Sequence, residues 1–341
     1  MDTILFLAHT EADGSLAKPA LEALGAARSL ADALGGSLAV GLLGSAVQAA
    51  ADAVSSCGAA RFLGVAGAEF GHSRYATDAA AAEALCKASG AAYIVAAGTS
   101  RWSRTLPGVS ARLGGRVDTH ITGLTAGDGV AVTRWYYRQR MEAVLTRSER
   151  PWTILLDPGS QTPWSGSAGT ARIEMLSVPI SPELTRTAVT GLRAPSAEEQ
   201  TIRPDADLLF VAGAGWTKTQ ADGAAHTAEA AALIKDFLRK SRASLGSSKS
   251  LVDQSSEGHS VLPFMTHLNQ VGQTGATPRH PKGLSTCCHG EEPHTVGWRF
   301  VSERRAVNLD PNCGWARGKA DVLYVADAFQ VMAKVNALLG G

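Results

Sequence analysis

Two rhythms of apolar residues alternate through the first hundred residues of the chain. Short apolar runs at 3–8, 37–43, 61–65 and 92–97 have the length of buried strands. Between them, the segments 19–34, 46–55 and 76–88 carry apolar residues at helical spacing, for example Leu21, Leu24 and Ala27. Strand and helix in alternation predict βαβ units, with a parallel sheet covered by helices on both faces.

The pattern changes after residue 100. A helix is predicted at 105–113, and the region 117–156 favours β segments, including 130–137 and 142–145, as an antiparallel extension of the same sheet. Residues 158–204 are rich in proline, serine, threonine and glycine, which is typical of a connection between domains. We therefore predict an N-terminal α/β domain at 1–195 and a C-terminal α/β domain at 196–341.

The second half restarts the rhythm of strand and helix. Strands are predicted at 207–212, 284–288, 306–309 and 322–326, and a helix at 224–241. A last helix at 329–339 has Asp327 where an N-cap belongs and ends before Gly340 and Gly341. The predicted fold class is α/β, with two domains that each contain a mainly parallel sheet flanked by helices.

Composition narrows the function classes. The chain has 341 residues, 45% of them hydrophobic, and a net charge of +1, so its overall charge favours neither a nucleic acid nor a membrane as partner. Residues 1–8 lack the features of a signal peptide, and no apolar run is long enough for membrane insertion. The five cysteines form no Cys-x-x-Cys pair, which favours a reducing compartment, and we expect the cytoplasm.

The segment Gln270-Val-Gly-Gln-Thr-Gly275 is the first candidate for chemistry. Its glycines let the backbone approach a ligand, and its amide and hydroxyl side chains supply hydrogen-bond donors. This composition suits a cofactor site. A polar loop that caps a helix is the alternative. A second glycine turn, Gly213-Ala-Gly215, lies between a strand and a helix, but a lone Gly-x-Gly is a weak nucleotide signal.

Several stretches in the right order resemble the α subunit of electron-transfer flavoprotein. The N-terminal half has a strand followed by Asp13-Gly-Ser-Leu16 and, later, the stretch from Thr99 to Gly114. The C-terminal half has the 270–275 segment, an Ala-x-Asn-x-Asp-Pro element at 306–311 and the step Ala320-Asp321. The resemblance covers nearly the whole chain, and it implies that the second domain is doubly wound and flavodoxin-like.

The resemblance implies a heterodimer with an electron-transfer flavoprotein β subunit and an FAD held mainly by the C-terminal domain. Electrons would come from a flavin-dependent dehydrogenase and leave to a membrane quinone oxidoreductase. The N-terminal domain would serve as scaffold and contact the β subunit, which holds the AMP where the family has one. Such a carrier has no substrate of its own, and no nucleophilic or hydrolytic constellation stands out in the sequence.

The resemblance also implies which residues contact the FAD. Gln273 and Thr274 would donate to the flavin ring or ribityl chain. His294 would lie near the pyrimidine end of the ring, where a positive dipole favours the anionic one-electron-reduced flavin that a one-electron carrier needs. Asn308 and Asp321 would hold the adenosine side. The full set of expected cofactor-binding residues is Gln270, Val271, Gly272, Gln273, Thr274, Gly275, His289, Gly290, His294, Asn308, Asp321, Gly213 and Lys249.

Parts of the expected flavin site depart from the family pattern. Where relatives have Ser-Gly-Arg-Gly, with the arginine over the flavin ring, this chain has Ala212-Gly-Ala-Gly215, and Trp216 or Lys218 could take part of that space. Gly-Ala-Ser-Arg becomes Gly246-Ser-Ser-Lys249, and Ile-Ser-Gly-Ala-Ile-Gln-His becomes Cys288-His-Gly-Glu-Glu-Pro-His294. His289 could therefore replace a serine beside the pyrophosphate or simply cap a strand.

Three alternatives remain open at this point. The altered segments are compatible with a flavin-free or AMP-binding scaffold subunit of a dehydrogenase complex. A metal site built from Cys287, Cys288, His289, His294 and Cys313 is disfavoured, because adjacent cysteines on a strand face opposite sides. The arginines of the first domain, Arg101, Arg104, Arg134, Arg138 and Arg140, form either a solvated face or a contact with the β subunit.

Overall fold

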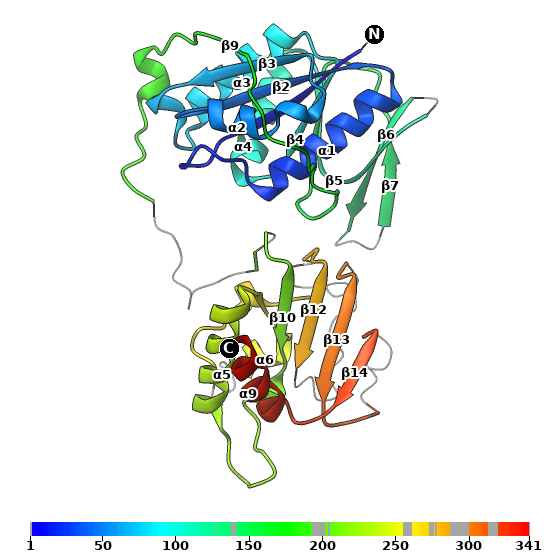
Figure 1. Ribbon diagram of the computed structural model, residues 1–341, viewed down its shortest axis with the longest axis vertical. Helices are drawn as coiled ribbons and strands as arrows, with labels where there is room; N and C mark the ends of the chain where they lie inside the picture. Colours follow the sequence, from blue (N-terminus) through cyan, green and yellow to red (C-terminus); the bar gives the residue numbers. More distant parts are fainter. Residues whose placement is uncertain are drawn as a thin grey trace. The chain divides into compact units, whose positions relative to one another are not determined.

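The fold is described from a computed structural model, which divides into two compact units, Met1–Leu192 and Arg193–Gly341 (Figure 1). The structure describes residues 2–127, 129–137, 141–192, 202–203, 205–254, 261–272, 276, 278–286, 300–312 and 320–340. Each unit is an α/β layer structure of its own, as predicted. The functional domains assigned at 1–195 and 196–341 stay a prediction.

Unit 1 is built on one large sheet. Among the described residues the strand order is β7-β6-β5-β8-β4-β1-β2-β3-β9. The strands are β1 (Thr3–His9), β2 (Ser37–Gly44), β3 (Arg61–Ala66), β4 (Tyr93–Ala97), β5 (Arg116–Ala126), β6 (Val130–Tyr136), β7 (Met141–Leu145), β8 (Trp152–Leu156) and β9 (Ile173–Met175). The helices are α1 (Lys18–Ala33), α2 (Gln48–Ala53), α3 (Tyr75–Ser89) and α4 (Ser100–Arg112), with short 3-10 turns at Ser55–Cys57, Ala68–Phe70 and Pro182–Thr185.

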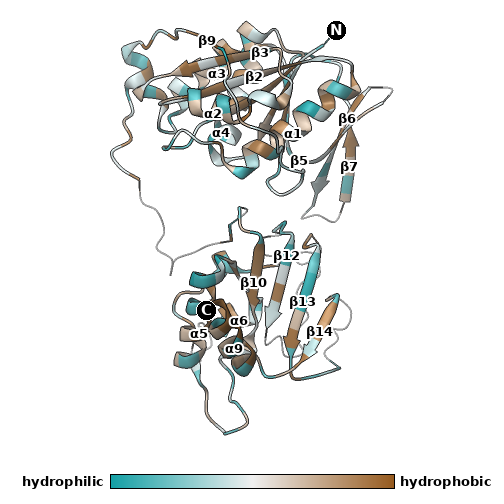
Figure 2. Ribbon diagram, in the orientation of Figure 1, coloured by the Kyte–Doolittle hydropathy of each residue, from teal (hydrophilic) through white to brown (hydrophobic). Residues whose placement is uncertain are grey.

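Helices cover both faces of this sheet because successive residues of a strand point to opposite sides. In β1, Ile4 and Phe6 pack with α1 and α2, whereas Leu5 and Leu7 pack with α3 and α4. All four side chains are fully buried. The prediction of a parallel sheet buried on both faces is therefore confirmed for the central strands (Figure 2).

The predicted antiparallel extension holds for two strands only. β6 pairs antiparallel with β5, and β7 antiparallel with β6. β8, the last strand of the predicted region, instead lies between β5 and β4 and is parallel to both. β5 adapts through a bulge between Asp118 and Ile121, where His120 has a left-handed backbone with φ 58°.

Helix α4 begins at Ser100, five residues before the predicted start. Thr99 is its N-cap, and the Thr99 hydroxyl accepts the backbone N–H of Trp102 at 3.3 Å. Polar residues had hidden this first turn, and one of them, Arg101, proves to be buried. Arg101 forms a two-pronged ion pair with Asp78 of α3, at 2.6 and 2.9 Å, and donates to the carbonyl of Phe70 at 2.7 Å. A solvated face does not describe this arginine.

The first part of the predicted inter-domain connection is bound to unit 1. The backbone N–H of Trp164 donates to the carbonyl of Leu21 on α1 at 2.9 Å, and that of Gly159 to the carboxylate of Glu22 at 2.6 Å. The backbone N–H of Ala171 donates to Asp52 on α2 at 2.9 Å. Burial raises the pKa of Glu22 above its usual range. The serine- and glycine-rich composition therefore reflects close backbone contact here rather than a free linker.

Asp118 holds the start of β5 to the end of β7 and the start of β8. Its carboxylate accepts two bonds from the Arg147 guanidinium, both at 2.9 Å, and one from the indole N–H of Trp152 at 2.9 Å. The hydrogen bonds from Arg147 are the main cause that lowers the pKa of Asp118, against the opposing effect of burial.

We expect Asp118 to make the stability of unit 1 decrease as the pH falls into the acid range. Because the folded pKa is lower than the unfolded one, its contribution is complete above the unfolded pKa of about 3.9 and is lost as the pH falls through the folded pKa. Urea unfolding between neutral and strongly acidic pH should show this decline, and Asp118→Asn should flatten it while reducing stability at neutral pH. An unchanged acid profile in Asp118→Asn would contradict the assignment.

Unit 2 is a smaller parallel sheet with order β11-β10-β12-β13-β14 in the described part of the chain. Its strands are β10 (Leu208–Ala212), β11 (Ser244–Ser247), β12 (Lys282–Thr286), β13 (Glu303–Asn308) and β14 (Val322–Val325). Its helices are α5 (Thr227–Ser241), α6 (Lys249–Asp253) and α9 (Ala328–Leu339), with 3-10 turns at Ala214–Trp216 and His267–Asn269. Numbered from the first strand of the unit, this is the order 2-1-3-4-5 of flavodoxin-like folds, as predicted.

The helices α5 and α9 pack side by side on one face of this sheet (Figure 1). Their buried residues Ile234, Phe237 and Met332 form a core with Phe210 of β10. The predicted N-cap of the last helix is confirmed, since Asp327 accepts the backbone N–H of Gln330 at 2.9 Å. Within the residues described, neither unit has a helix both long and apolar enough to cross a membrane.

Candidate functional site

The carboxyl ends of the five parallel strands of unit 2 meet at one edge of the sheet. In folds of this topology ligands bind outside that edge, where the strand order reverses, here between β10 and β12. Gly213 directly follows β10, and its backbone N–H donates to the carbonyl of Thr286, the last residue of β12, at 2.8 Å. The glycine turn that was weak as a sequence motif therefore occupies the expected position for a ligand site.

The predicted 270–275 segment begins at the same edge. The backbone N–H of Ser248 donates to the carbonyl of Ala212 at 2.8 Å, and that of Val271 to the carbonyl of Ser247 at 3.0 Å. Gln270 also forms a parallel bridge with Ser247. These bonds connect the ends of β10 and β11 with the segment, so the structure brings Gly213, Lys249 and Gln270 to one edge.

The base of this segment is closed and tightly packed. The backbone N–H of Gly272 donates to the carbonyl of Ala276 at 2.9 Å, and that of Ala276 to the carbonyl of Gln270 at 2.8 Å. Gly272 has φ 138°, a backbone conformation that favours glycine. Gln270 and Val271 are buried. Gln273, Thr274 and Gly275 come between Gly272 and Ala276 in the sequence and lie outside the described residues.

A glycine on β11 is what allows the segment to lie this close. A Cβ added to Gly246 would stand 2.7 Å from Cγ2 of Val271 and 3.3 Å from Cδ1 of Leu209. Separations of this size are too short for carbon atoms, so a larger residue would displace the base of the 270–275 segment. The neighbouring Ser247 is fully buried, and its hydroxyl has no hydrogen-bond partner in the described part of the protein.

Lys249 is the cation of this edge, and it is half-exposed at the start of α6. Its ammonium lies 2.7 Å from the carboxylate of Asp253, one helical turn later. The other oxygen of Asp253 lies 2.9 Å from Nε2 of His267. Hydrogen bonds from Lys249 and then from His267 lower the pKa of Asp253. An anionic ligand group at Lys249 would therefore replace or share the Asp253 carboxylate as the partner of the ammonium.

Of the two residues suggested as a replacement for the family arginine, Trp216 points into the core. Trp216 is fully buried, where its indole N–H donates to the hydroxyl of Thr286 at 2.8 Å and its ring packs 4.6 Å from that of Phe329. Lys218 is exposed. The turn after β10 therefore holds an indole in the core. Ala214 occupies the position of the family's arginine.

The two expected adenosine contacts are separated by the fold. Asn308 ends β13 at the carboxyl edge, where it is buried and its side-chain oxygen accepts the backbone N–H of Asp310 at 3.0 Å. Asp321 precedes β14 at the opposite edge, where its carboxylate accepts the backbone N–H and a guanidinium N–H of Arg304 at 2.7 and 2.9 Å. The hydrogen bonds from Arg304 lower the pKa of Asp321.

The carboxylate that does accompany Asn308 is Asp327, which the sequence reading assigned only as an N-cap. Asn308, Asp327 and Phe329 line one small hollow, together with Gln220. The backbone N–H of Ala326 donates to the carbonyl of Asn308 at 3.2 Å. Two Ala-Asp steps flank the last strand, Ala320-Asp321 before it and Ala326-Asp327 after it. Because β14 is parallel to β13, only the step after the strand lies at the same edge as Asn308, and this position distinguishes Asp327 from Asp321.

The remaining expected contacts, His289, Gly290 and His294, lie outside the described residues, as do Cys287, Cys288 and Cys313. Within the described residues, no group of three histidine, cysteine, aspartate or glutamate side chains could hold a metal ion. The described edge suits a flavin nucleotide in its donor set: a glycine turn at the switch point, an unused buried hydroxyl and an amide-rich segment seated on a glycine.

Comparison with known proteins places the chain in a class. The family model described as the electron transfer flavoprotein domain matches residues 4–181, just over half of the chain. The chain belongs to this family, as the sequence resemblance predicted. No curated protein matches it. The match lies within unit 1 and does not extend to the carboxyl edge of unit 2.

Family membership establishes a role of the kind that electron transfer flavoproteins have. The family is associated with flavin, and its members work with electron-transfer partners.

Proposed function

We propose that this chain is the FAD-binding α subunit of a heterodimeric electron-transfer flavoprotein. The observation that carries the proposal is the seating of Gln270–Gly272 on the end of β11, beside the switch point of a flavodoxin-like sheet. The β subunit, a flavin-dependent dehydrogenase as donor and a quinone oxidoreductase as acceptor complete the proposed pathway. The proposed location is the cytoplasm.

The residues that would hold FAD are those at the carboxyl edge of unit 2. Gly213 and Lys249 follow β10 and β11, Asn308 ends β13, and Gln270 to Gly272 lie beside the end of β11. Gln273, Thr274 and Gly275 belong to the same proposed set. The segment that follows β12 would add His289, Gly290 and His294. When bound, the flavin supplies the acceptance and release of electrons, and the protein binds and orients it. Asp321 could contribute only from the opposite edge, so Asp327 is the better candidate for the carboxylate beside Asn308.

The proposal is tested on the heterodimer purified from co-expression with a β subunit. Flavin absorption bands, and FAD released on denaturation and identified by chromatography, are the expected results. A colourless, tightly assembled complex would reject the proposal. AMP in such a complex would instead support the alternative, an AMP-binding scaffold subunit of a dehydrogenase complex.

Gly246→Ala should lower FAD occupancy at least about tenfold, a loss of roughly 1.4 kcal/mol of binding free energy. The added Cβ would stand 2.7 Å from Val271 and displace the base of the 270–275 segment. The measurement is flavin per protein after purification, followed by titration of the apoprotein with FAD.

The matched control is Gly127→Ala, because no atom lies within 4 Å of a Cβ added at Gly127. This control should keep the FAD occupancy of the unaltered protein. Full occupancy in a folded Gly246→Ala variant would remove the 270–275 segment from the flavin site.

A further inference from the structure

The carboxyl end of β1 in unit 1 is closed by side chains of the protein itself. β1 lies between β4 and β2, at the point where the strand order of the sheet reverses, and folds of this topology bind ligands outside such a point. His9, the last residue of β1, packs there against Trp102 of α4, with ring centres 5.8 Å apart. The His9 side chain is 16% exposed and Trp102 is 1% exposed. The imidazole is therefore part of the packing at this edge.

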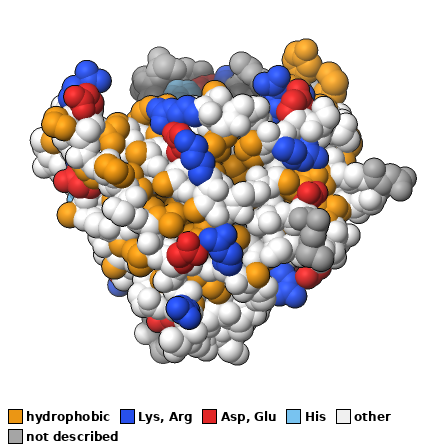
Figure 3. All heavy atoms as spheres, turned by 90° about the horizontal axis from the view of Figure 1, so that it is seen from above, with side chains coloured by type: hydrophobic (Ala, Val, Ile, Leu, Met, Phe, Trp, Pro, Cys, Tyr) orange, Lys and Arg blue, Asp and Glu red, His pale blue; other side chains and the backbone are white. Residues whose placement is uncertain are grey.

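A buried ion pair faces this imidazole. Basic and acidic side chains are interspersed on the face of the molecule in Figure 3, whereas the paired side chains of Arg101 on α4 and Asp78 on α3 are 8% and 0% exposed. Burial lowers the pKa of His9 most, and the positive charge of Arg101 lowers it further. Weaker opposing effects come from Glu11, the carbonyl of Thr10 and Asp78. The site therefore favours a neutral ring.

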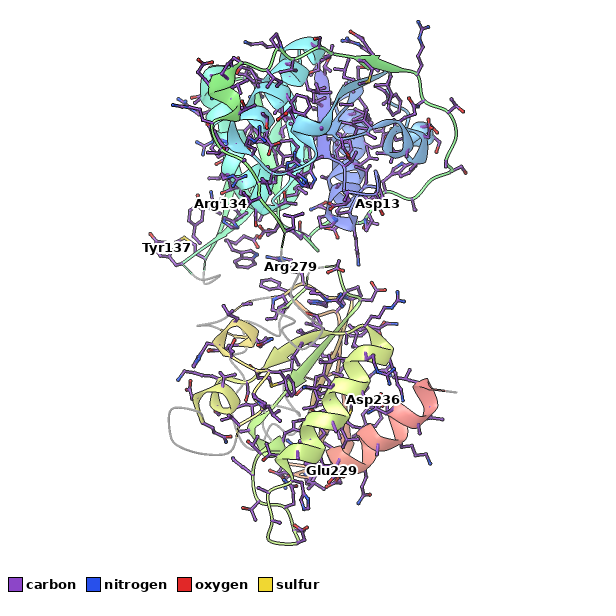
Figure 4. The ribbon with its side chains drawn as sticks, turned by 90° about the vertical axis from the view of Figure 1, so that its left-hand side faces the viewer. Asp13, Arg134, Tyr137, Glu229, Asp236 and Arg279 are labelled. Carbon is purple, nitrogen blue, oxygen red and sulfur yellow. The ribbon has the colours of Figure 1, made fainter. Side chains whose placement is uncertain are left out.

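The turn that follows β1 carries a carboxylate within reach of the same ring. Nδ1 of His9 lies 3.9 Å from the carboxylate of Glu11, a distance too long for a hydrogen bond. The turn closes on itself, because the backbone N–H of Glu11 donates to the carbonyl of Ser15 at 2.9 Å and that of Gly14 to the carbonyl of Glu11 at 3.0 Å. Figure 4 labels Asp13, which belongs to this turn. A displacement of Glu11 would therefore move the turn with it.

We propose that His9 is an acid-sensitive switch at the carboxyl edge of unit 1: the neutral ring packs on Trp102, and the ring protonated by solvent moves to pair with Glu11. Protonation puts a second positive charge beside Arg101 in a site that solvates charge poorly, which disfavours the packed position. Asp78 already accepts two hydrogen bonds from Arg101. Glu11 is 47% exposed, so the charged ring gains both a counter-charge and contact with solvent there.

Acid should destabilise unit 1 through this switch before it affects Asp118. Because the folded pKa of His9 is lower than the unfolded value of about 6.5, the unfolded chain binds the proton first. The stability that the neutral ring contributes is complete above the unfolded pKa and is lost as the pH falls from there through the folded pKa. The contribution of Asp118 declines only below about pH 3.9.

The test is a pH titration of the full chain by NMR. The imidazole of His9, the indole N–H of Trp102 and the backbone N–H of Glu11 should shift together, with one midpoint below about pH 6.5. Glu11→Gln should move the midpoint to lower pH, because it removes a negative charge that favours the protonated ring, and the turn should no longer follow the titration. In urea unfolding, His9→Asn should flatten the decline in stability over the same pH range.

His72→Asn is the control, because His72 is an exposed histidine of the same unit. This variant should keep both the midpoint and the acid profile of the unaltered protein. A His9 midpoint at or above pH 6.5 would overturn the proposal and show instead that the indole stabilises the charged ring. So would a Trp102 indole that does not follow His9, or a midpoint that Glu11→Gln leaves unchanged. Circular dichroism confirms that each variant is folded, and the Glu11→Gln titration decides the matter if His9→Asn does not fold.

Discussion

Replacing Asp78 by alanine should lower the unfolding free energy of unit 1 by about 3–5 kcal/mol. Asp78 is fully buried between α3 and α4, and the guanidinium of Arg101, which it pairs with, is only 8% exposed. The variant leaves this guanidinium in the interior, where it keeps its hydrogen bond to the Phe70 carbonyl but loses its counter-charge. A buried charge without its counter-charge is costly because the interior solvates it poorly.

Glu174→Ala is the matched control, because Glu174 also pairs with an arginine, Arg61, but both side chains are about half exposed. An exposed pair contributes about 0–1 kcal/mol, so this variant should lose little stability. Urea unfolding followed by tryptophan fluorescence measures both. Equal losses in the two variants would show that burial does not set the importance of the Asp78–Arg101 pair.

Trp216→Ala should destabilise unit 2 by about 3–5 kcal/mol, the usual cost of removing a large aromatic side chain from a core. Trp216 is fully buried between the end of β12 and the start of α9. It contacts Phe329, with ring centres 4.6 Å apart, and donates a hydrogen bond to Thr286. The variant would leave a cavity directly beneath the carboxyl edge and remove the bond that links the β10 turn to β12.

This variant also tests how the cofactor edge depends on the core of unit 2. Thermal unfolding measures the stability of the variant, and its flavin content shows whether the carboxyl edge still binds the cofactor. Lys218→Ala, at the exposed position two residues later, should change stability by less than about 0.5 kcal/mol. If Lys218→Ala lost flavin and Trp216→Ala kept both its flavin and its stability, then Lys218, and not Trp216, would be the residue that matters in this turn.

Long periodic segments were predictable from the sequence, because burial leaves a regular trace in it. The strands β1 to β4 and the helices α1 and α3 follow the predicted rhythm, and the N-cap Asp327 was found from its position before an apolar helix. β11 and α6 were missed. β11 reads Ser-Leu-Gly-Ser and α6 has five residues, so neither carries enough periodic apolar residues to stand out.

The candidate site also combines features that the sequence predicts with features that only the structure decides. The 270–275 segment was recognised from its own residues, and the structure seats its base at the carboxyl edge of unit 2. The environment of Arg101 and Trp216 could not be predicted, because their partners Asp78 and Thr286 lie 23 and 70 residues away in the chain. The choice between Asp321 and Asp327 likewise depended on which end of β14 lies at that edge.

The sequence by itself determined the α/β class, the two successive rhythms of strand and helix, the family and the cofactor-like segment, because each is written in local periodicity or in a contiguous motif. Only the tertiary structure decided which motif residues share an edge, which arginine is buried and, among the described residues, which strands lie at the ends of each sheet. These depend on the order of strands in a sheet, and that order is set by packing between segments far apart in the chain.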